Sequence, residues 1–195
     1  MNNQSLFEKY RDGNHWEKHP TIYAEYFADF LKERHKENIS SKIIVDLGCG
    51  NGRDVNVFYN IQMLTIGIDI SIASILYAER KYPRSAFRLE NIENLGFSFE
   101  SIDAYFCINV MHYVDAPKVL GEIYRTLRPG GYAFIHFNLL IIDQDYSIDY
   151  HQKKSDVYEL VKDFKIVEEK IFLREDTLPT AHTHHIMQVI IKKIN

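Results

Sequence analysis

The stretch that decides the fold is IVDLGCGNGRDVNVF, from Ile44 to Phe58. It opens as an apolar, β-branched run that contains one acid, Asp46, and three glycines follow at alternate positions, Gly48, Gly50 and Gly52. Glycine loses much conformational entropy on folding, so a fold retains it where a side chain would obstruct a turn or a bound ligand. The stretch therefore predicts a buried strand, a tight turn and a helix that begins from the turn.

The same pattern of strand, turn and helix recurs along the chain. An amphipathic helix is expected first, at residues 17–38. Strands are then expected at 42–47, 64–70, 86–90, 102–110 and 132–137, and helices at 52–59, 71–82 and 116–127. Strands that alternate with helices form βαβ units, whose right-handed crossovers give a parallel sheet covered by helices.

The chain changes character after residue 137. A helix is expected at 155–164, and two β-rich runs follow at 165–173 and 183–194. The segment between these runs is too short for a crossover helix, so we expect an antiparallel hairpin that closes the sheet. Only residues 138–154 are available to insert after the fifth strand, which argues against a large cap domain.

Composition narrows the class of protein. The 195 residues are 46% hydrophobic, which suits one domain: an arm and helix at 1–40, then a core at 41–195. The formal charge of −4, with no run of like charges, disfavours a nucleic-acid partner. Two cysteines without metal or redox spacing, and no signal-peptide or membrane-spanning stretch, indicate a cytoplasmic protein with no membrane partner.

The residues around the glycine turn indicate a nucleoside ligand. Open parallel sheets bind ligands at the carboxyl ends of their strands, and a glycine loop before a helix exposes backbone N–H groups there. Asp69 ends the second strand, where a carboxylate can accept hydrogen bonds from a ribose diol. Asn91 follows the third strand, where its amide can both donate to and accept from an adenine edge.

Five segments together resemble the successive motifs of the class I S-adenosylmethionine-dependent methyltransferases. They are DLGCGNG, GIDIS, FRLENIENLGF, SIDAYFCINVMHYV and LGEIYRTLRPGGYAFIHF, within residues 42–137. The resemblance implies an α/β three-layer sandwich with a seven-stranded, mostly parallel sheet in the order 3-2-1-4-5-7-6, strand 7 being antiparallel. This agrees with the hairpin expected from the residues themselves.

The resemblance also implies how S-adenosylmethionine, and its product S-adenosylhomocysteine, would lie. The methionine part would contact the glycine turn with Asp46 near its ammonium group, Asp69 would hold the ribose, and Asn109 would offer its backbone carbonyl to the amine. Asn91 departs from the family, because many relatives have an aspartate beside the adenine. The implied cofactor set is Asp46, Gly48, Cys49, Gly50, Asp69, Ile70, Asn91, Ile92 and Asn109.

Histidines are the candidates for the acceptor side of the site. Methyl transfer requires an aligned acceptor and, for some acceptors, a base that removes a proton. His112 and Tyr113 follow the fourth strand and His136 and Asn138 end the fifth, so all four are expected at the ligand edge. His184, at the start of the antiparallel strand, is expected beside His136.

Three roles are open for these histidines: a base or substrate contact, a structural or exposed position, or a metal site. A strand alternates its faces, so His182 and His184 would share one face and His185 would take the other. A cluster of all three is therefore not expected, and no metal is assigned.

The aromatic segment before the first strand suggests a lid. Tyr10, Trp16 and His19 precede or begin the first helix, and in small-molecule members of the family such an arm folds over cofactor and acceptor. The alternative is a helix packed on the sheet with a frayed start.

The sequence as a whole predicts a methyltransferase, a monomer or homodimer, that acts on nitrogen, oxygen or sulfur of a small molecule. One alternative is a regulatory or partner protein that binds S-adenosylmethionine without catalysis. An NAD-dependent oxidoreductase is less favoured, because Arg53 stands where the dinucleotide fingerprint has its third glycine. Asp103, at the start of the fourth strand, and Cys107, within it, are expected to be structural.

Overall fold

The structure is a computed structural model that describes residues 19–143, 145, 147–176 and 181–195. The chain divides into two compact units, Met1–Leu95 and Gly96–Asn195.

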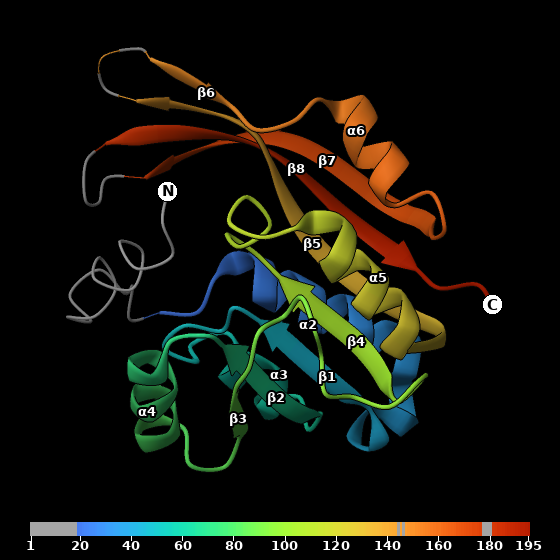
Figure 1. The fold of residues 1–195 in the computed structure, drawn as a ribbon. Coiled ribbons are helices and arrows are strands. Elements are labelled where there is room, and N and C mark those ends of the chain that lie inside the picture. The colour runs from blue at the N-terminus through green and yellow to red at the C-terminus, as the bar shows by residue number, and fades with distance from the viewer. Residues whose placement is uncertain (1–18, 144, 146, 177–180) are drawn as a thin grey trace. The chain divides into compact units, whose positions relative to one another are not determined.

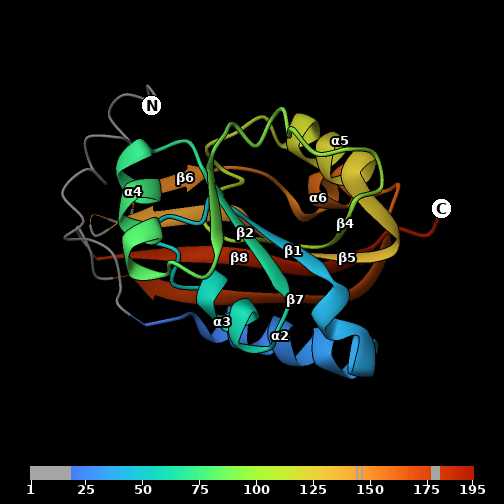
Figure 2. The same cartoon turned by 90° about the horizontal axis from the view of Figure 1, so that it is seen from below.

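The first unit is a parallel three-stranded sheet with its helices (Figure 2). Its strands lie in the order β3-β2-β1, with β1 paired to β2 and β2 to β3 in parallel. The elements are α2 (Ile22–His35), the 3-10 helix η1 (Lys36–Ser41), β1 (Ile43–Leu47), α3 (Val55–Asn60), β2 (Leu64–Asp69), α4 (Ile72–Lys81) and β3 (Ala86–Leu89). Both crossovers run in the same direction along the sheet, so α3 and α4 cover the same face.

Capping residues set where the helices of this unit begin. The Thr21 side chain accepts a hydrogen bond from the Ala24 N–H, so α2 begins at residue 22 rather than 17. Ser71 caps α4 in the same way, and its Oγ accepts from the Ser74 N–H at 3.3 Å. The helix after the glycine turn begins at Val55 instead of Gly52, because the Gly52 N–H closes the turn onto the Cys49 carbonyl at 2.9 Å.

The second unit is a mixed sheet with two helices (Figure 1). Its strands lie in the order β4-β5-β8-β7; β4 and β5 are parallel, and β8 is antiparallel to both of its neighbours. The elements are β4 (Ile102–Cys107), α5 (Ala116–Thr126), β5 (Leu127–Asp143), β6 (Ile148–Tyr150), α6 (Lys154–Leu160), β7 (Lys165–Asp176) and β8 (His182–Lys192). The expected hairpin is therefore confirmed, with β7 and β8 as its strands.

The α/β class with a mostly parallel sheet is confirmed, and the strand count differs by one. The described residues form three strands in the first unit and five in the second, where seven in all were expected. The extra strand is β6, which pairs antiparallel with the end of β5 through Ile142 and Ile148. The segment after residue 137, expected as a possible insertion, thus extends β5 and adds a short hairpin.

Strand β5 also begins earlier than expected. The Arg128-Pro129-Gly130-Gly131 sequence separates the helix predicted at 116–127 from the strand predicted at 132–137, yet it lies within β5. The pairing of β4 with β5 shifts register between Ile102 and Ala104, which absorbs the irregular residues as a bulge. A proline is tolerated at such a position because its missing N–H is not needed by the ladder.

The structural residues expected in β4 are confirmed. Asp103 is buried and its Oδ2 accepts from Arg128 Nη1 at 2.7 Å, and Cys107 is fully buried. β4 itself ends at Cys107 rather than residue 110, since Asn109 takes a positive φ of 60° that breaks the strand. Among the described residues, no helix has both the length and the apolar character of a membrane span.

Candidate functional site

The glycine turn in the first unit combines two different uses of glycine. Gly48, Gly50 and Gly52 all have positive φ, at 74°, 51° and 76°, where a side chain is strained. A Cβ on Gly52 would also lie 2.9 Å from the ring of Phe87, so this glycine is needed for packing. A Cβ on Gly50 would meet nothing within 4 Å, so the turn presents bare backbone to open space there.

Asp69 fixes this turn from the end of β2. Its Oδ2 accepts from the Gly50 N–H at 2.9 Å and its Oδ1 from the Ser71 N–H at 2.8 Å. A carboxylate oxygen has two lone pairs, so each oxygen retains the capacity for one more hydrogen bond. The carboxylate is thus held rigidly beside Gly50 and can still accept from a diol.

Acids crowd the same strand ends. Asp46 is buried, and burial raises its pKa, as do the negative charges of Asp54 and Asp69. Burial likewise raises the pKa of Asp69, against the hydrogen bonds from the Ser71 and Gly50 backbone. Buried carboxylates in mutual repulsion favour a cationic ligand, because an added positive charge relieves both effects.

The remaining first-unit candidates are Cys49 in the glycine turn and residues at the ends of β2 and β3. Asn91 is exposed and its Oδ1 accepts from the Glu93 N–H at 2.9 Å, which leaves its amide N–H₂ for a ligand. Ile92 and Cys49 are buried, whereas the side chain of Ile70, next to Asp69, is 51% exposed. Ile70 therefore offers apolar surface at the strand edge where the acids lie.

In the second unit, the guanidinium group of Arg174 on β7 links Asn109 to Asp176. Its Nη1 donates to the Asn109 side-chain oxygen, which holds the turn after β4. Its Nε and Nη2 donate to the two carboxylate oxygens of Asp176 at 2.9 and 2.8 Å. Such a two-point contact fixes the orientation of the carboxylate.

Asp176 also contacts histidines on β8. The His184 Nε2 lies 3.2 Å from its Oδ2, and the His182 Nε2 lies 3.8 Å from the same oxygen. Burial raises the pKa of Asp176, but hydrogen bonds from His184 and Arg174 outweigh it and lower the pKa to about 2. Burial lowers the pKa of His184, whose buried Nδ1 has no hydrogen-bond partner among the described residues.

His112 adjoins this group. Its Nδ1 lies 3.0 Å from the Asn138 amide nitrogen, and its ring centroid is 6.4 Å from that of His184. Burial lowers the pKa of His112 to about 3, with the nearby His151 as the next cause. Tyr113, 40% exposed, places its ring 3.8 Å from that of His112, measured between centroids.

His136 has a different neighbourhood from the one expected. Because β5 continues to Asp143, His136 lies in mid-strand opposite Gln188, whose Oε1 is 3.2 Å from its Nε2. The register places His184 opposite Ile141, several residues further along β5. The expected pairing on one face is confirmed for His182 and His184, whose ring centroids lie 4.7 Å apart.

The predicted lid residues are not part of the clusters around the glycine turn and around Asp176. Tyr10 and Trp16 lie outside the described residues, and His19 is exposed just before α2. Sequence reasoning missed Arg174 and Asp176, because the strand before the hairpin was expected to end at residue 173. Arg174 and Asp176 are two positions apart and continue the alternation of side chains between the two faces of this strand. That alternation was the sequence signal that could have extended the predicted strand beyond residue 173.

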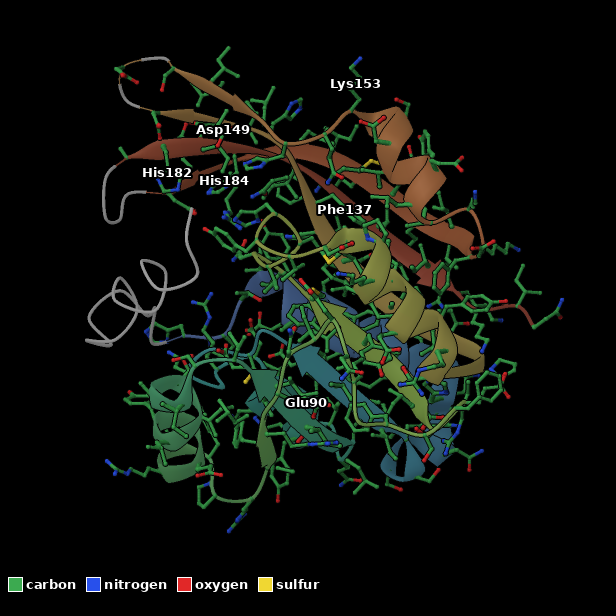
Figure 3. The ribbon with its side chains drawn as sticks, in the orientation of Figure 1. Glu90, Phe137, Asp149, Lys153, His182 and His184 are labelled. Carbon is green, nitrogen blue, oxygen red and sulfur yellow. The ribbon has the colours of Figure 1, made fainter. Side chains whose placement is uncertain are left out.

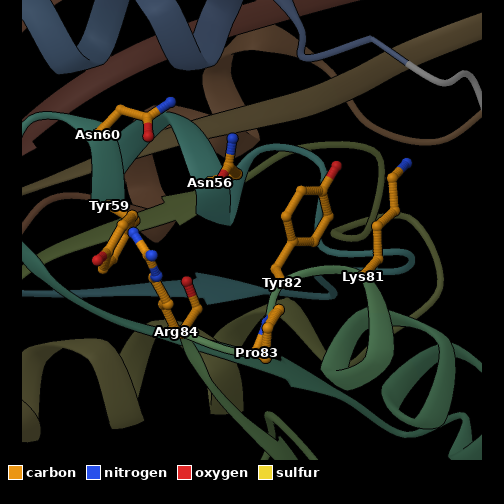
Figure 4. Close-up of a pocket in the computed structure, with 8 residues that line it drawn as sticks. Asn56, Tyr59, Asn60, Lys81, Tyr82, Pro83 and Arg84 are labelled. Atoms are coloured by element: carbon orange, nitrogen blue, oxygen red, sulfur yellow. The ribbon is translucent and has the colours of Figure 1, made fainter.

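The first unit also has a pocket of about 230 Å³ at a different place (Figure 4). It lies between the end of α3 and the segment that leads into β3, hence at the amino ends of the strands. Asp46 and Asp69 mark the carboxyl ends, so this pocket is separate from the glycine turn. Its lining residues are Asn56, Tyr59, Asn60, Lys81, Tyr82, Pro83, Arg84 and Ser85.

Comparison with known proteins agrees with the geometry. Residues 45–135 match the model of a methyltransferase domain. A Mycolicibacterium smegmatis protein named "Probable S-adenosylmethionine-dependent methyltransferase" is 25% identical over 87% of this chain and 63% of its own length. A tRNA U34 carboxymethyltransferase of Campylobacter concisus is 26% identical over 73% of this chain and 55% of its own. The chain therefore spans less than two thirds of either relative.

A solved structure gives the same fold. The 1,6-didemethyltoxoflavin-N1-methyltransferase of Burkholderia thailandensis superposes with a TM-score of 0.69 at 16% identity, covering 98% of this chain and 87% of that one. The family match, the curated relatives and the fold agree with the motifs read from the sequence. The chain is therefore similar to the class I S-adenosylmethionine-dependent methyltransferases in its motifs, in the methyltransferase-domain match over residues 45–135 and in its fold.

Proposed function

We propose that this protein transfers a methyl group from S-adenosylmethionine to a nitrogen, oxygen or sulfur atom of a small molecule. The observation that carries the proposal is the glycine turn, where bare backbone at Gly50 faces open space beside the fixed carboxylate of Asp69. When bound, the cofactor supplies the electrophilic methyl group, and the residues of this chain bind and orient it.

The roles of the first-unit residues follow from their chemistry. Gly48, Cys49 and Gly50 would contact the methionine part, and the buried Asp46 would face its ammonium group, whose charge relieves the crowded acids. Asp69 would accept from both ribose hydroxyls with its remaining lone pairs. Asn91, Ile92 and Ile70 would surround the adenine, with apolar surface from Ile70 and N–H groups from Asn91.

The second unit supplies the candidates for the acceptor. His112 and His184 belong to one polar group with Asp176, whereas His136 is engaged with Gln188 and is less suited to meet a substrate. Asn109 would offer its backbone carbonyl to the cofactor, in the conformation that Arg174 holds. Residues 1–40, with Tyr10, Trp16 and His19, would serve as the lid, and residues 41–195 as the core.

Two relatives bear on the class of acceptor, a small molecule or tRNA. The B. thailandensis structure contains a small-molecule substrate with S-adenosylhomocysteine, and this chain carries no basic run. The C. concisus relative is named for action on tRNA, so the expected exclusion of nucleic acid does not follow from the comparisons. Both acceptor classes therefore belong in the test.

Two measurements test the proposal in sequence. Calorimetry with S-adenosylhomocysteine should show one site per chain, and NAD should show none; binding of NAD alone would contradict the family role. Methyl-labelled cofactor is then supplied with pools of small metabolites and, separately, with unmodified tRNA. Label in small products supports the proposal; label in tRNA overturns the small-molecule part, and binding without label in either pool favours a non-catalytic binding protein.

A further inference from the structure

The ends of β7 and β8 bring three metal-ligating side chains onto one face of the sheet. Asp176, His182 and His184 each offer a ligand atom, and these atoms all lie within 4.8 Å of one another. Among the described residues, this is the one group of three histidine, cysteine or acidic side chains with that spacing. Figure 3 shows His182 and His184 side by side on β8.

The strand pairing explains why the three meet. Asp176 lies directly opposite His182 in the antiparallel register, and His184 is two residues further along β8. Side chains two apart on a strand share a face, and directly opposed residues are the closest pairs across a ladder. The ligand atoms therefore come from two hydrogen-bonded strands rather than from a loop, so their spacing is set by the sheet.

The spacing matches a tetrahedral metal site. Zinc lies about 2.0–2.2 Å from imidazole nitrogen and carboxylate oxygen, which separates ligand atoms by roughly 3.3 Å. The Asp176 Oδ2 is 3.2 Å from the His184 Nε2 and 3.8 Å from the His182 Nε2. Small side-chain rotations suffice to bring both nitrogens and this oxygen around one ion.

Arg174 holds the carboxylate in place without occupying all of it. Its two contacts use one lone pair on each oxygen of Asp176. The second lone pair on Oδ2 faces the His184 Nε2, and an ion bound to that nitrogen would take the place of its proton between the two atoms. Partners that orient a ligating carboxylate are typical of metal sites. The positive charge of Arg174 opposes an incoming cation, so strong ligands are required, and two imidazoles provide them.

The site keeps an open side. The side chain of Asp176 is 33% exposed and that of His182 is 17% exposed, so water or a ligand group can reach an ion between them. Three protein ligands with an accessible fourth position are the pattern of reactive rather than purely structural zinc sites. We propose that Asp176, His182 and His184 bind one divalent transition-metal ion of the zinc type.

The test uses the full chain, freed of metal with a chelator and then titrated with Zn²⁺ by calorimetry and with Co²⁺ by visible absorption. We expect one Zn²⁺ site whose dissociation constant rises at least tenfold in Asp176→Asn and in His182→Ala. Co²⁺ should give the absorption bands of a four-coordinate ion, and these should be lost in the same variants. Zn²⁺ should also raise the melting temperature of the unaltered chain and not of the variants.

The matched control is His185→Ala. His185 is adjacent to His184 on β8 but lies on the opposite face, so its removal should leave the Zn²⁺ site unchanged. Equal losses in His185→Ala and His182→Ala, or no loss in either His182→Ala or Asp176→Asn, would overturn the proposal. S-adenosylhomocysteine binding is measured on each variant as well. A variant that still binds S-adenosylhomocysteine is folded, so its loss of Zn²⁺ binding is then due to the changed ligand and is independent of the proposed methyltransferase function.

Discussion

Single residues at the glycine turn decide whether the turn packs or binds. A side chain at Gly52 would collide with the ring of Phe87, whereas a Cβ at Gly50, which also has positive φ, would meet open space. The same motif therefore contains one glycine that serves the core and another that exposes backbone. Substitutions can separate these two roles.

Gly50→Ala should weaken S-adenosylhomocysteine binding at least tenfold, because the new methyl group enters the space proposed for the methionine part. Its stability should fall by only about 1 kcal/mol, the strain of a side chain in the left-handed region. Calorimetry and thermal melts measure the two effects. Gly130→Ala is the control, since Gly130 has φ of 83° and equally open space but lies in the second unit; an equal loss of binding there would refute the assignment.

Asp69→Ala should weaken cofactor binding by about 1 to 3 kcal/mol, through loss of a charged pair of hydrogen bonds to the ribose. The measurement is calorimetry with S-adenosylhomocysteine. Asp54→Asn serves as comparison, because Asp54 is a buried acid of the same unit whose Oδ1 accepts from the Thr21 N–H. If both variants bind equally well, Asp69 does not hold the ribose.

At the scale of elements, glycines in α5 and β5 show how position decides the effect of one methyl group. Gly131 lies in the irregular start of β5, where a Cβ would be 2.8 Å from the Asp103 carbonyl and 2.9 Å from that of Arg128. Gly121 lies in α5, where a Cβ would meet nothing within 4 Å. The first glycine allows β5 to approach β4, and the second only weakens its helix.

Gly131→Ala should therefore lower the free energy of unfolding by about 1 to 3 kcal/mol, since backbone carbonyls cannot move aside cheaply. Gly121→Ala should raise it by about 0.5 to 1 kcal/mol through helix propensity. Urea unfolding of both variants checks the signs. Destabilisation by both, to the same extent, would contradict the distinction.

The elements also show what sequence can predict. Apolar runs before Gly48 and through Ile102–Cys107 place strands correctly, because burial on both sides of a sheet demands such runs. The Arg-Pro-Gly-Gly sequence is typical of a turn, yet it forms a bulge within β5, held by the hydrogen bonds of the Gly130 N–H to the Lys193 carbonyl and of the Lys193 N–H to the Gly131 carbonyl. The contact of Arg174 with Asn109, 65 positions away, depends on tertiary register that no local pattern carries.

At the scale of the whole molecule, buried histidines link stability to pH. His136 is 2% exposed, and burial lowers its pKa to about 3, from about 6.5 for an exposed histidine. Between about pH 3 and pH 6.5, His136 is protonated in the unfolded chain and neutral in the folded chain. The contribution of His136 to stability is therefore fully present above pH 6.5 and is lost as the pH falls.

His136→Gln should flatten this dependence, because a neutral amide can meet Gln188 without titrating. The slope of unfolding free energy against pH, measured between about pH 4 and 6, should decrease by up to about 1.4 kcal/mol per pH unit. Parallel curves for His136→Gln and the unaltered chain would disprove the linkage.

The outermost strand of the second unit has a consequence for self-association. Among the described strands of the second unit, β7 pairs with β8 alone, and it exposes Leu173. Such an edge can pair with a strand of another chain. Exposed Lys165 and Lys170, and a register shift between Ile166 and Glu168, oppose this by charge repulsion and by twisting the edge. Replacing Lys165 and Lys170 by neutral residues would remove this charge repulsion, and the edge of β7 would then promote aggregation.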